Sequence, residues 1–160
     1  MANRIGRPPY FDPVTNIRFD TDCAEFEGWL TKESAWVKDW RRRYFILKGS
    51  KLFFAKTGTS APHGMIDLST CTTVKSADVK TRKNNSFEIS THDTTFFLYA
   101  DNEKEKDDWI GNVGRAIVRC SSTYQGGVVK KSSGSGAGMD NQGEEDDDSS
   151  VDSDNPYAYH

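Results

Sequence analysis

The chain has 160 residues and a net charge of −3, and 35% of its residues are hydrophobic, which is lean for a chain packed along its whole length. The charge is unevenly spread. Residues 26–120 carry 16 Lys and Arg against 12 Asp and Glu, whereas residues 121–160 carry two lysines against eight acids. This pattern favours one mildly basic domain with tails and argues against a strongly cationic nucleic-acid binder.

Cysteine usage and hydropathy bear on the compartment in which the protein works. Cys23, Cys71 and Cys120 are odd in number and widely spaced, which fits neither a disulfide framework nor a zinc site and indicates a reducing compartment. The first residues lack the apolar stretch of a secretory signal, and the longest apolar run, FFLYA at 96–100, is far shorter than a membrane helix. We therefore expect a cytoplasmic protein, without metal or cofactor, whose contact with membranes is peripheral.

Residues 1–25 mix three prolines with scattered aromatic residues, and we expect them to form an irregular lead-in. Seven short segments rich in β-branched and aromatic residues follow, separated by turn-forming Gly, Asn, Asp, Pro and Ser residues. The segments are 28–32, 42–47, 51–56, 64–68, 72–77, 86–91 and 95–100. Seven short strands at close spacing predict an antiparallel barrel or sandwich.

The apolar pattern then changes to a helical period in DNEKEKDDWIGNVGRAIVRC, residues 101–120. One stripe contains Trp109, Ile110, Val113, Ala116, Ile117 and Cys120. Asp101 or Asn102 can cap the N-terminus of this helix, and acids fill its first turns, as the helix dipole favours. Two glycines within the helix each cost about 1 kcal/mol relative to alanine. We therefore expect packing against the open end of the strands to hold the helix, with Trp109 closing that end.

The composition changes again over residues 121–160. SSGSGAG at 132–138 has the composition of a flexible linker, and GEEDDDSSVDSD at 143–154 contains one apolar residue. Neither segment can bury enough surface to offset its ordering entropy, so we expect a disordered Gly/Ser linker and acidic tail after a domain at 26–120. The tail either repels anionic surfaces and covers basic residues of the domain or is a passive solvated segment.

Seven strands followed by one amphipathic helix is the order of the pleckstrin homology (PH) domain, and the sequence resembles that family over residues 26–119. The matching segments are EGWLTK (27–32), KDWRRRYFIL (38–47), LFF (52–54), PHGMIDL (62–68) and FFLYADNEKEKDDWI (96–110). Trp109 stands where the family has its helix tryptophan. The resemblance implies a mainly β fold, a seven-stranded antiparallel barrel of two near-orthogonal sheets, capped by one C-terminal α-helix.

Lipid-binding members of the family resemble one another in a basic pattern that falls here on Lys32, Arg41 and Arg43. Arg41 and Arg43 are two residues apart on a strand and share a face, whereas Arg42 points away. Lys32 comes from the neighbouring strand, and three cations around one spot can hold a phosphate. Lys38 is expected to assist from the rim. The resemblance thus implies a phosphoinositide headgroup site, whereas a short basic run by itself is more often a solvated strand face.

Two positions depart from the members that resemble tight binders of trisphosphorylated inositol lipids. Those members usually have a Tyr near the end of the third strand, where this chain has Phe54, and often an Arg before the glycine of the fourth strand, where this chain has His63. Phe54 has no hydroxyl, and a neutral His63 offers one donor at most. Fewer ligands favour a less phosphorylated headgroup. His63 either contacts a phosphate or only shapes its turn.

The turn between the first two strands contains Trp36 and Val37 among several cations. The resemblance implies that this loop borders the headgroup pocket and faces the bilayer, where a Trp ring suits the lipid interface. We expect Trp36 and Val37 to insert into the membrane while nearby cations attract anionic lipid. In the alternative, Trp36 folds back to cover the barrel.

Other classes of function fit less well. The histidines are His63, His92 and His160, and no HExxH, Walker or GxSxG motif occurs, so we expect no catalytic residues. The modest positive charge, clustered at one loop end, argues against nucleic acid. The expected protein is a monomeric, non-enzymatic phosphoinositide-binding module that targets membranes in signalling or trafficking. The alternative is a PH-fold adaptor that docks an unidentified protein with weak or no lipid specificity.

Overall fold

Residues 6–128 are described by the structure, which is a computed structural model. Within them, seven antiparallel strands form one sheet in the order β6-β5-β4-β3-β9-β8-β7. The strands are β3 (Phe26–Glu33), β4 (Trp40–Lys48), β5 (Lys51–Ala55), β6 (Gly64–Asp67), β7 (Cys71–Ser76), β8 (Ser86–Thr91) and β9 (Thr95–Tyr99). Each strand coincides with one predicted segment to within a few residues at its ends, so the prediction of seven antiparallel strands is confirmed.

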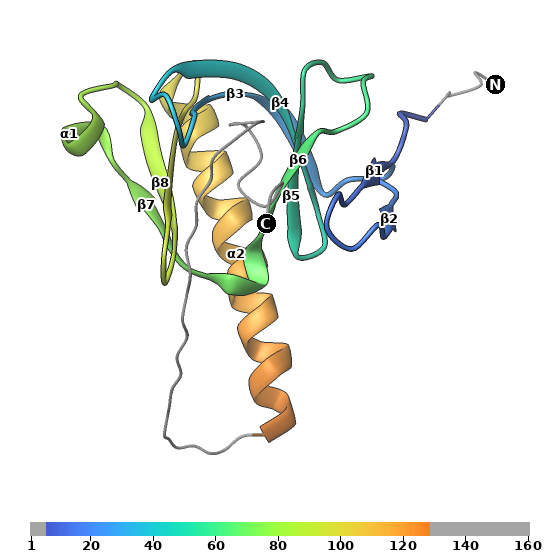
Figure 1. Cartoon of the computed structure of the whole chain (residues 1–160). Helices are drawn as coiled ribbons and strands as arrows, with labels where there is room; N and C mark the ends of the chain where they lie inside the picture. The colour runs from blue at the N-terminus through green and yellow to red at the C-terminus, as the bar shows by residue number, and fades with distance from the viewer. Residues whose placement is uncertain (1–5, 129–160) are drawn as a thin grey trace.

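The sheet is strongly bent, so that β7, β8 and β9 lie apart from β5 and β6 on the other side of α2 in Figure 1. Strand β3 joins the two halves. It pairs with β4 along its whole length but with β9 only at Thr31↔Tyr99 and Lys32↔Leu98. The two sheets that the resemblance implied are therefore two halves of one hydrogen-bonded sheet. Its edge strands, β6 and β7, are linked by a 3₁₀ turn at Leu68–Thr70 and do not pair, so no closed barrel forms.

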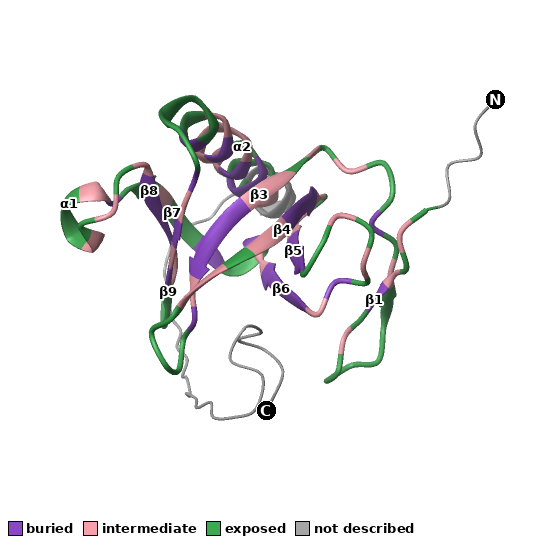
Figure 2. Ribbon diagram, turned by 90° about the horizontal axis from the view of Figure 1, so that it is seen from above, coloured by how far each residue is buried: buried purple, intermediate pink, exposed green. Residues whose placement is uncertain are grey.

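Helix α2 (Glu103–Val128) covers one side of the bent sheet and carries Trp109 into the core. Figure 2 shows buried residues along the strands and on the part of α2 that faces them. Trp109 is 2% exposed, and its ring centroid lies 4.6 Å from that of Phe26 and 6.4 Å from that of Phe45, both edge-on. Truncating such a side chain to alanine costs about 3–5 kcal/mol. The prediction that Trp109 closes the sheet is consistent with this burial.

Helix α2 begins at the predicted place and extends further than expected. The Asn102 side-chain oxygen accepts the backbone N–H of Glu105 at 2.8 Å, which caps the helix. The helix continues to Val128, past the boundary predicted at residue 120. The disordered linker and acidic tail were expected from residue 121; residues 121–128 belong to α2, and residues 129–160 lie outside the described part of the chain.

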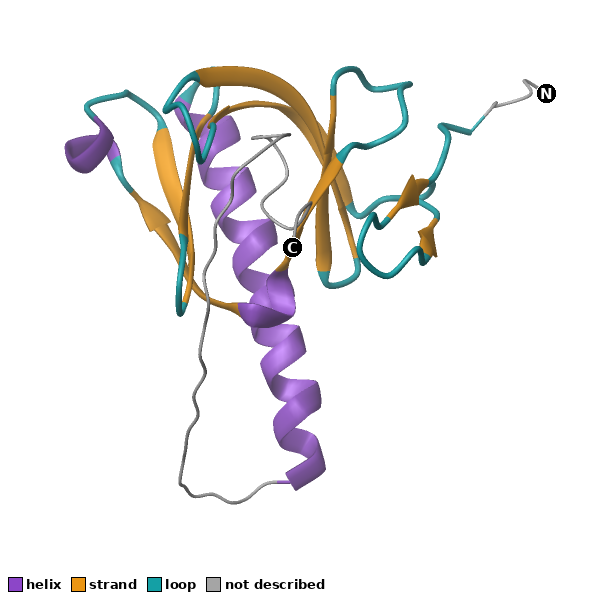
Figure 3. Ribbon diagram, in the orientation of Figure 1, coloured by secondary structure: helices purple, strands orange, loops and turns teal. Residues whose placement is uncertain are grey.

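A short helix and a small hairpin were not predicted. Helix α1 (Asp78–Thr81) lies in the connection from β7 to β8, as Figure 3 shows. In the lead-in that we expected to be irregular, β1 (Tyr10–Phe11) pairs with β2 (Arg18–Phe19) in a small hairpin. Strands of two residues are too short to show an alternating pattern in the sequence. The hairpin exists because Tyr10, 1% exposed, packs against the outer side of the main sheet.

Candidate functional site

The hairpin of β3 and β4 places three cations on one face of the sheet. In its register Lys32 lies opposite Arg41, and Leu30 lies opposite Arg43. Residues directly opposite each other on paired strands share a face, and Leu30 is 1% exposed in the core. Lys32, Arg41 and Arg43, hereafter the basic cluster, therefore extend the core face of the sheet towards the β3–β4 loop. This is the arrangement that the spacing of Arg41 and Arg43 predicts.

Lys32 is the most buried member of the basic cluster. Lys32 is 2% exposed, and its Nζ lies 5.2 Å from the ring centroid of Phe54 and 6.0 Å from that of Phe96. Nζ also donates to the carbonyl oxygen of Glu33 at 3.4 Å. An ammonium over an aromatic face is attracted by the ring quadrupole, which offsets part of the cost of removing a charge from water. The fold thus holds a positive charge at the end of its hydrophobic core.

Phe54 connects His63 to the basic cluster. The Phe54 and His63 rings are nearly perpendicular, with centroids 5.3 Å apart, and the His63 backbone N–H donates to the Phe54 carbonyl at 2.9 Å. Lys32 and His63 therefore contact the same ring, although one comes from β3 and the other from the β5–β6 connection. Phe54 itself is fully buried and contributes packing rather than a hydrogen-bond donor.

Arg41 and Arg43 are half-buried and contact the hairpin itself. Arg43 donates from Nη1 to the carbonyl oxygen of Arg42 at 3.0 Å, and Arg41 Nη2 lies 3.7 Å from the exposed Asp39 carboxylate. A long ion pair between partly exposed groups is weak and screened by salt. A phosphate can compete for these guanidinium groups because it offers higher charge and several acceptors. Lys38 is exposed in the adjoining loop with φ 62°, and its role as a ligand stays a prediction.

Arg42 lies on the opposite face of β4 and has a structural role. It donates to both oxygens of Asp101, at 2.9 and 3.1 Å, and its guanidinium lies 5.0 Å from the ring centroid of Trp29. The hydrogen bond from Arg42 holds the pKa of Asp101 below its ordinary value. The pair joins the first residues of β4 to the turn that precedes α2. Alternation along the strand predicts that Arg42 faces away from Arg41 and Arg43, but nothing in the sequence indicated this distant partner.

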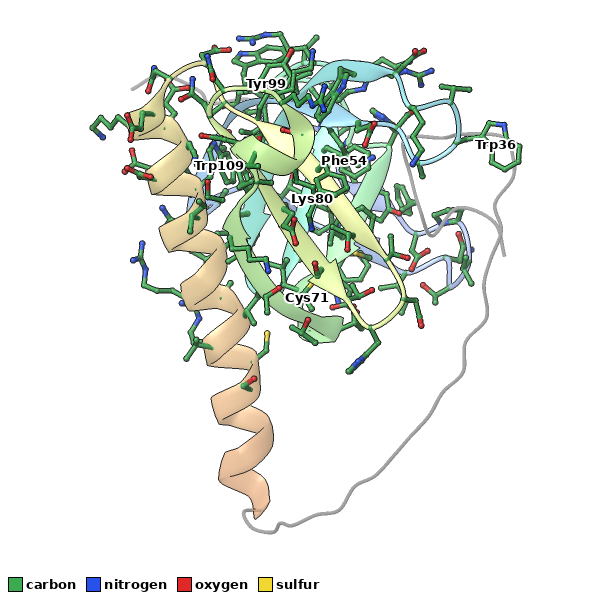
Figure 4. The ribbon with its side chains drawn as sticks, turned by 90° about the vertical axis from the view of Figure 1, so that its left-hand side faces the viewer. Trp36, Phe54, Cys71, Lys80, Tyr99 and Trp109 are labelled. Atoms are coloured by element: carbon green, nitrogen blue, oxygen red, sulfur yellow. The ribbon has the colours of Figure 1, made fainter. Side chains whose placement is uncertain are left out.

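The β3–β4 loop, residues 34–39, projects its apolar tip into solvent. Trp36 is 61% exposed and Val37 is 49% exposed. In Figure 4 the Trp36 side chain extends from the side of the molecule opposite to α2. The Ser34 N–H donates to the Asp39 carbonyl at 2.7 Å, and the Ser34 hydroxyl accepts the Asp39 N–H at 3.3 Å, which closes the loop at its base. This exposure excludes the alternative in which Trp36 folds back to cover the sheet.

A second group of basic and aromatic side chains on the outer face of the sheet was not predicted. Lys83 Nζ lies 5.6 Å from the ring centroid of Trp40 and 5.8 Å from that of Tyr99, and these two rings are 5.2 Å apart. Trp40 alternates with Arg41 along β4, so this group faces away from the basic cluster. Its members come from three distant parts of the sequence. The contacts fasten the α1–β8 connection to β4 and β9.

Residues 6–128 contain neither a helix that could span a membrane nor a metal-binding cluster. No helix there combines the length and apolar character that crossing a membrane requires. No three His, Cys, Asp or Glu side chains in the same part of the chain are grouped so that they could hold a metal ion. The basic cluster, with Phe54 and His63 beside it, is the candidate functional site, and its positive charge suits an anion.

Comparisons with known proteins agree with this architecture. A family model described as "PH domain" matches residues 24–118. "Pleckstrin homology domain-containing protein 1" from Arabidopsis thaliana is 41% identical over 122 residues, which cover 72% of this chain and 83% of that protein. A "RAC family serine/threonine-protein kinase homolog" from Dictyostelium discoideum is 45% identical over 91 residues, but the match spans only 20% of its length. The similarity to that kinase is therefore confined to a small part of it.

Solved structures lead to the same result. The crystal structure of the C-terminal PH domain of pleckstrin in complex with a D-myo-inositol pentakisphosphate is 32% identical in sequence to this chain. The match covers 58% of this chain and 97% of that one, with a TM-score of 0.51. The family match extends from the residues just before β3 to the part of α2 that carries Trp109. The chain belongs to the PH domain family.

Proposed function

We propose that this PH domain binds the headgroup of a phosphoinositide lipid and thereby recruits the protein to the cytosolic face of a membrane, without catalysing a reaction. The observation that carries the proposal is the basic cluster, in which Lys32, Arg41 and Arg43 share the core face of the β3–β4 hairpin. The pleckstrin domain of similar sequence, solved with an inositol pentakisphosphate, supports the same ligand chemistry.

Each cation has a distinct part in this binding. The guanidinium groups of Arg41 and Arg43 are planar forks that can each donate two hydrogen bonds to one phosphate. Lys32 adds a point charge that the rings of Phe54 and Phe96 hold in place, so little side-chain entropy is lost on binding. A preorganised charge of this kind strengthens the attraction for a phosphate that is doubly negative near neutral pH.

The positions beside the basic cluster suggest the class of headgroup. Phe54 offers no hydroxyl, and His63 stacks edge-on against it with fewer donors than an arginine has. Two potential phosphate contacts are therefore weak or missing. We propose a headgroup with few ring phosphates, such as a phosphatidylinositol monophosphate, as the preferred ligand.

The β3–β4 loop provides the second part of the binding. Trp36 and Val37 are exposed at its tip, and Lys38 follows them. An indole is well suited to the interface because its ring is apolar and its N–H stays hydrated. Each cation near an anionic membrane surface adds about 1 kcal/mol. Headgroup binding and loop insertion would both contribute to affinity for a bilayer. Only headgroup binding would contribute to affinity for a soluble inositol phosphate, which has no lipid tail.

The test is co-sedimentation with phosphatidylcholine vesicles that each contain one phosphoinositide, compared with vesicles that contain phosphatidylserine at matched charge. The full chain should bind at least one phosphoinositide more tightly than phosphatidylserine. Arg43→Ala should remove that preference. Arg115→Ala is the matched control, since Arg115 is an exposed arginine on α2 outside the basic cluster, and it should bind as the wild type does.

Two results would refute the proposal. If the wild type shows no preference for any phosphoinositide over phosphatidylserine, the domain does not recognise the headgroup, and the protein-docking alternative takes its place. If Arg43→Ala and Arg115→Ala bind equally well, the basic cluster is not the binding site.

A further inference from the structure

The N-terminal hairpin exposes apolar side chains that the PH fold does not account for. Phe11, Val14 and Ile17 are 56%, 55% and 52% exposed, and they precede the region that the family model matches. The large hydrophobic side chains exposed in the described part of the chain are Phe11, Val14, Ile17, Trp36, Val37, Val79 and Val118. Most of them therefore belong to two segments, the β1–β2 hairpin and the β3–β4 loop, rather than being scattered over the surface.

The hairpin is firmly attached to the domain. Tyr10 is 1% exposed, with its ring centroid 5.4 Å from that of Phe53, and Phe19 packs on the same ring at 5.9 Å. Arg7 donates to the carbonyl oxygen of Gly58 at 2.7 Å and to Glu27 at 3.3 Å. The ring contacts tie the hairpin to β5, and Arg7 ties the segment just before it to β3 and the β5–β6 connection. Its exposed side chains are thus displayed by a fixed support and not by a loose terminus.

The hairpin turn exposes apolar side chains, while its charged side chains contact neighbouring residues of the same hairpin. The Asp12 carboxylate accepts the Val14 N–H and the Thr15 hydroxyl, each at 3.0 Å. Arg18 pairs with Asp20 at 3.1 Å. The Arg18 charge offsets that of Asp20, whereas the hydrogen bonds of Asp12 order the turn without changing its charge. The tip therefore presents three apolar side chains beside the exposed polar residues Thr15 and Asn16.

The hairpin and the β3–β4 loop also share an orientation. Figure 2 shows the β1 hairpin extending to the side of the molecule opposite to α2. Figure 4 shows Trp36 extending to that same side. Both apolar segments thus lie on the side of the molecule away from α2.

We propose that Phe11, Val14 and Ile17 form a second bilayer-contacting element, which enters the same lipid interface as Trp36 and Val37. This inference rests on the proposed phosphoinositide binding. Two rigid apolar contacts with the basic cluster on the same side fix the tilt of the domain on the membrane. Burial of three exposed apolar side chains also adds affinity that is independent of the headgroup.

The test compares vesicle binding with binding of a water-soluble inositol phosphate. The variant combines Phe11→Ser, Val14→Ser and Ile17→Ser. Its matched control combines Val79→Ser and Val118→Ser, which remove exposed valines from α1 and α2. The hairpin variant should lose about tenfold or more in vesicle affinity and keep its affinity for the inositol phosphate. The control should match the wild type in both. Thermal unfolding of each variant verifies that the fold is retained.

A fluorescent probe gives an independent measurement. Val14→Cys, in a chain that also carries Cys23→Ser and Cys120→Ser, is labelled with an environment-sensitive dye. Cys71 is buried, and burial raises the pKa of its thiol to about 12, so it should remain unlabelled. The dye should shift to shorter wavelength on vesicles that contain the preferred phosphoinositide, and a dye at Val79→Cys should not shift.

The outcomes separate this inference from the proposed function. If the hairpin variant binds vesicles as the wild type does while Arg43→Ala does not, the inference is wrong and the proposed function stands. If Arg43→Ala also binds normally, both are wrong. If sedimentation shows a dimer for the wild type and a monomer for the hairpin variant, the apolar tip is a contact between two copies of the chain, and the inference is overturned.

Discussion

Arg42 of β4 and Asp101, which precedes the cap of α2, form a two-pronged ion pair with hydrogen bonds of 2.9 and 3.1 Å. The pair lies on the face of β4 opposite to Arg41 and Arg43. Three consecutive arginines therefore divide between two roles, with the outer two in the basic cluster and the middle one supporting the fold.

Substitutions in this run should separate stability from binding. Arg42→Ala should lower the free energy of unfolding by about 0.5–1 kcal/mol, because both partners are 49% exposed and solvent screens their interaction. It should leave phosphoinositide binding unchanged. Arg43→Ala should leave the free energy of unfolding nearly unchanged. It should weaken vesicle binding about 10- to 100-fold, as expected for the loss of a charged hydrogen-bond donor. Urea unfolding and vesicle titration of both variants measure the two effects, and equal binding losses would contradict the division of roles.

Lys32 should prove to be a functional residue placed where an apolar one would fit. In Lys32→Met the side chain still covers the rings of Phe54 and Phe96 but has no charge. We expect the free energy of unfolding of Lys32→Met to lie within about 1 kcal/mol of the wild-type value or above it, because burying a charge is costly. The variant should also lose its selectivity for the headgroup. Lys75→Met, at an exposed position on β7, serves as control. Normal selectivity in Lys32→Met would exclude Lys32 from the site.

Trp36 should contribute to bilayer affinity but not to headgroup affinity. It is 61% exposed at the tip of the β3–β4 loop, so its removal leaves no cavity. Trp36→Ala should weaken vesicle binding about tenfold and leave binding of a soluble inositol phosphate unchanged, because the insertion contribution requires a bilayer. Titration calorimetry measures the second affinity. Equal losses in both assays would mean that Trp36 shapes the site rather than contacting lipid.

His63 should limit affinity for the headgroup. Its ring lies against Phe54, which Lys32 also contacts, so a longer cationic side chain at this position can reach a phosphate near the basic cluster. His63→Arg should strengthen binding several-fold through a permanent charge and additional donors. His63→Gln keeps polarity without charge and should bind no better than the wild type. If the two variants have identical affinity, His63 only shapes its turn.

Stability should decline in acid in a way that depends on Asp78. A hydrogen bond from the Ser86 backbone N–H, and then Lys106, hold the pKa of the Asp78 carboxyl below its ordinary value. A carboxyl with a lowered folded-state pKa stabilises the fold above its unfolded pKa of about 3.9, and this contribution disappears as pH falls through the folded pKa. Asp78→Asn should therefore lose less stability than the wild type between about pH 5 and pH 2.

Urea unfolding at several pH values measures this difference. Asp107→Asn, which changes an exposed acid on α2, is the control and should follow the wild-type curve. A curve for Asp78→Asn that is parallel to the wild type over the whole acid range would show that the contacts of Asp78 do not stabilise the fold.

Local patterns in the sequence determined the strands, the helix and the faces of single side chains. Alternation along a strand has a period of two residues, so Arg41 and Arg43 had to share a face and Arg42 had to lie opposite. The apolar stripe around Trp109 likewise fixed which side of α2 is buried. These properties depend only on neighbours within a few residues, and the resemblance to PH domains supplied their order in space.

Only the tertiary structure decided which distant groups meet. The burial of Lys32 over Phe54 and Phe96, the pairing of Arg42 with Asp101, and the docking of Tyr10 on Phe53 depend on how the sheet bends and on which strands become neighbours. The position of the β1–β2 hairpin beside the domain has the same origin. Such contacts join residues far apart in sequence, and their free energies arise from three-dimensional burial, which no local period encodes.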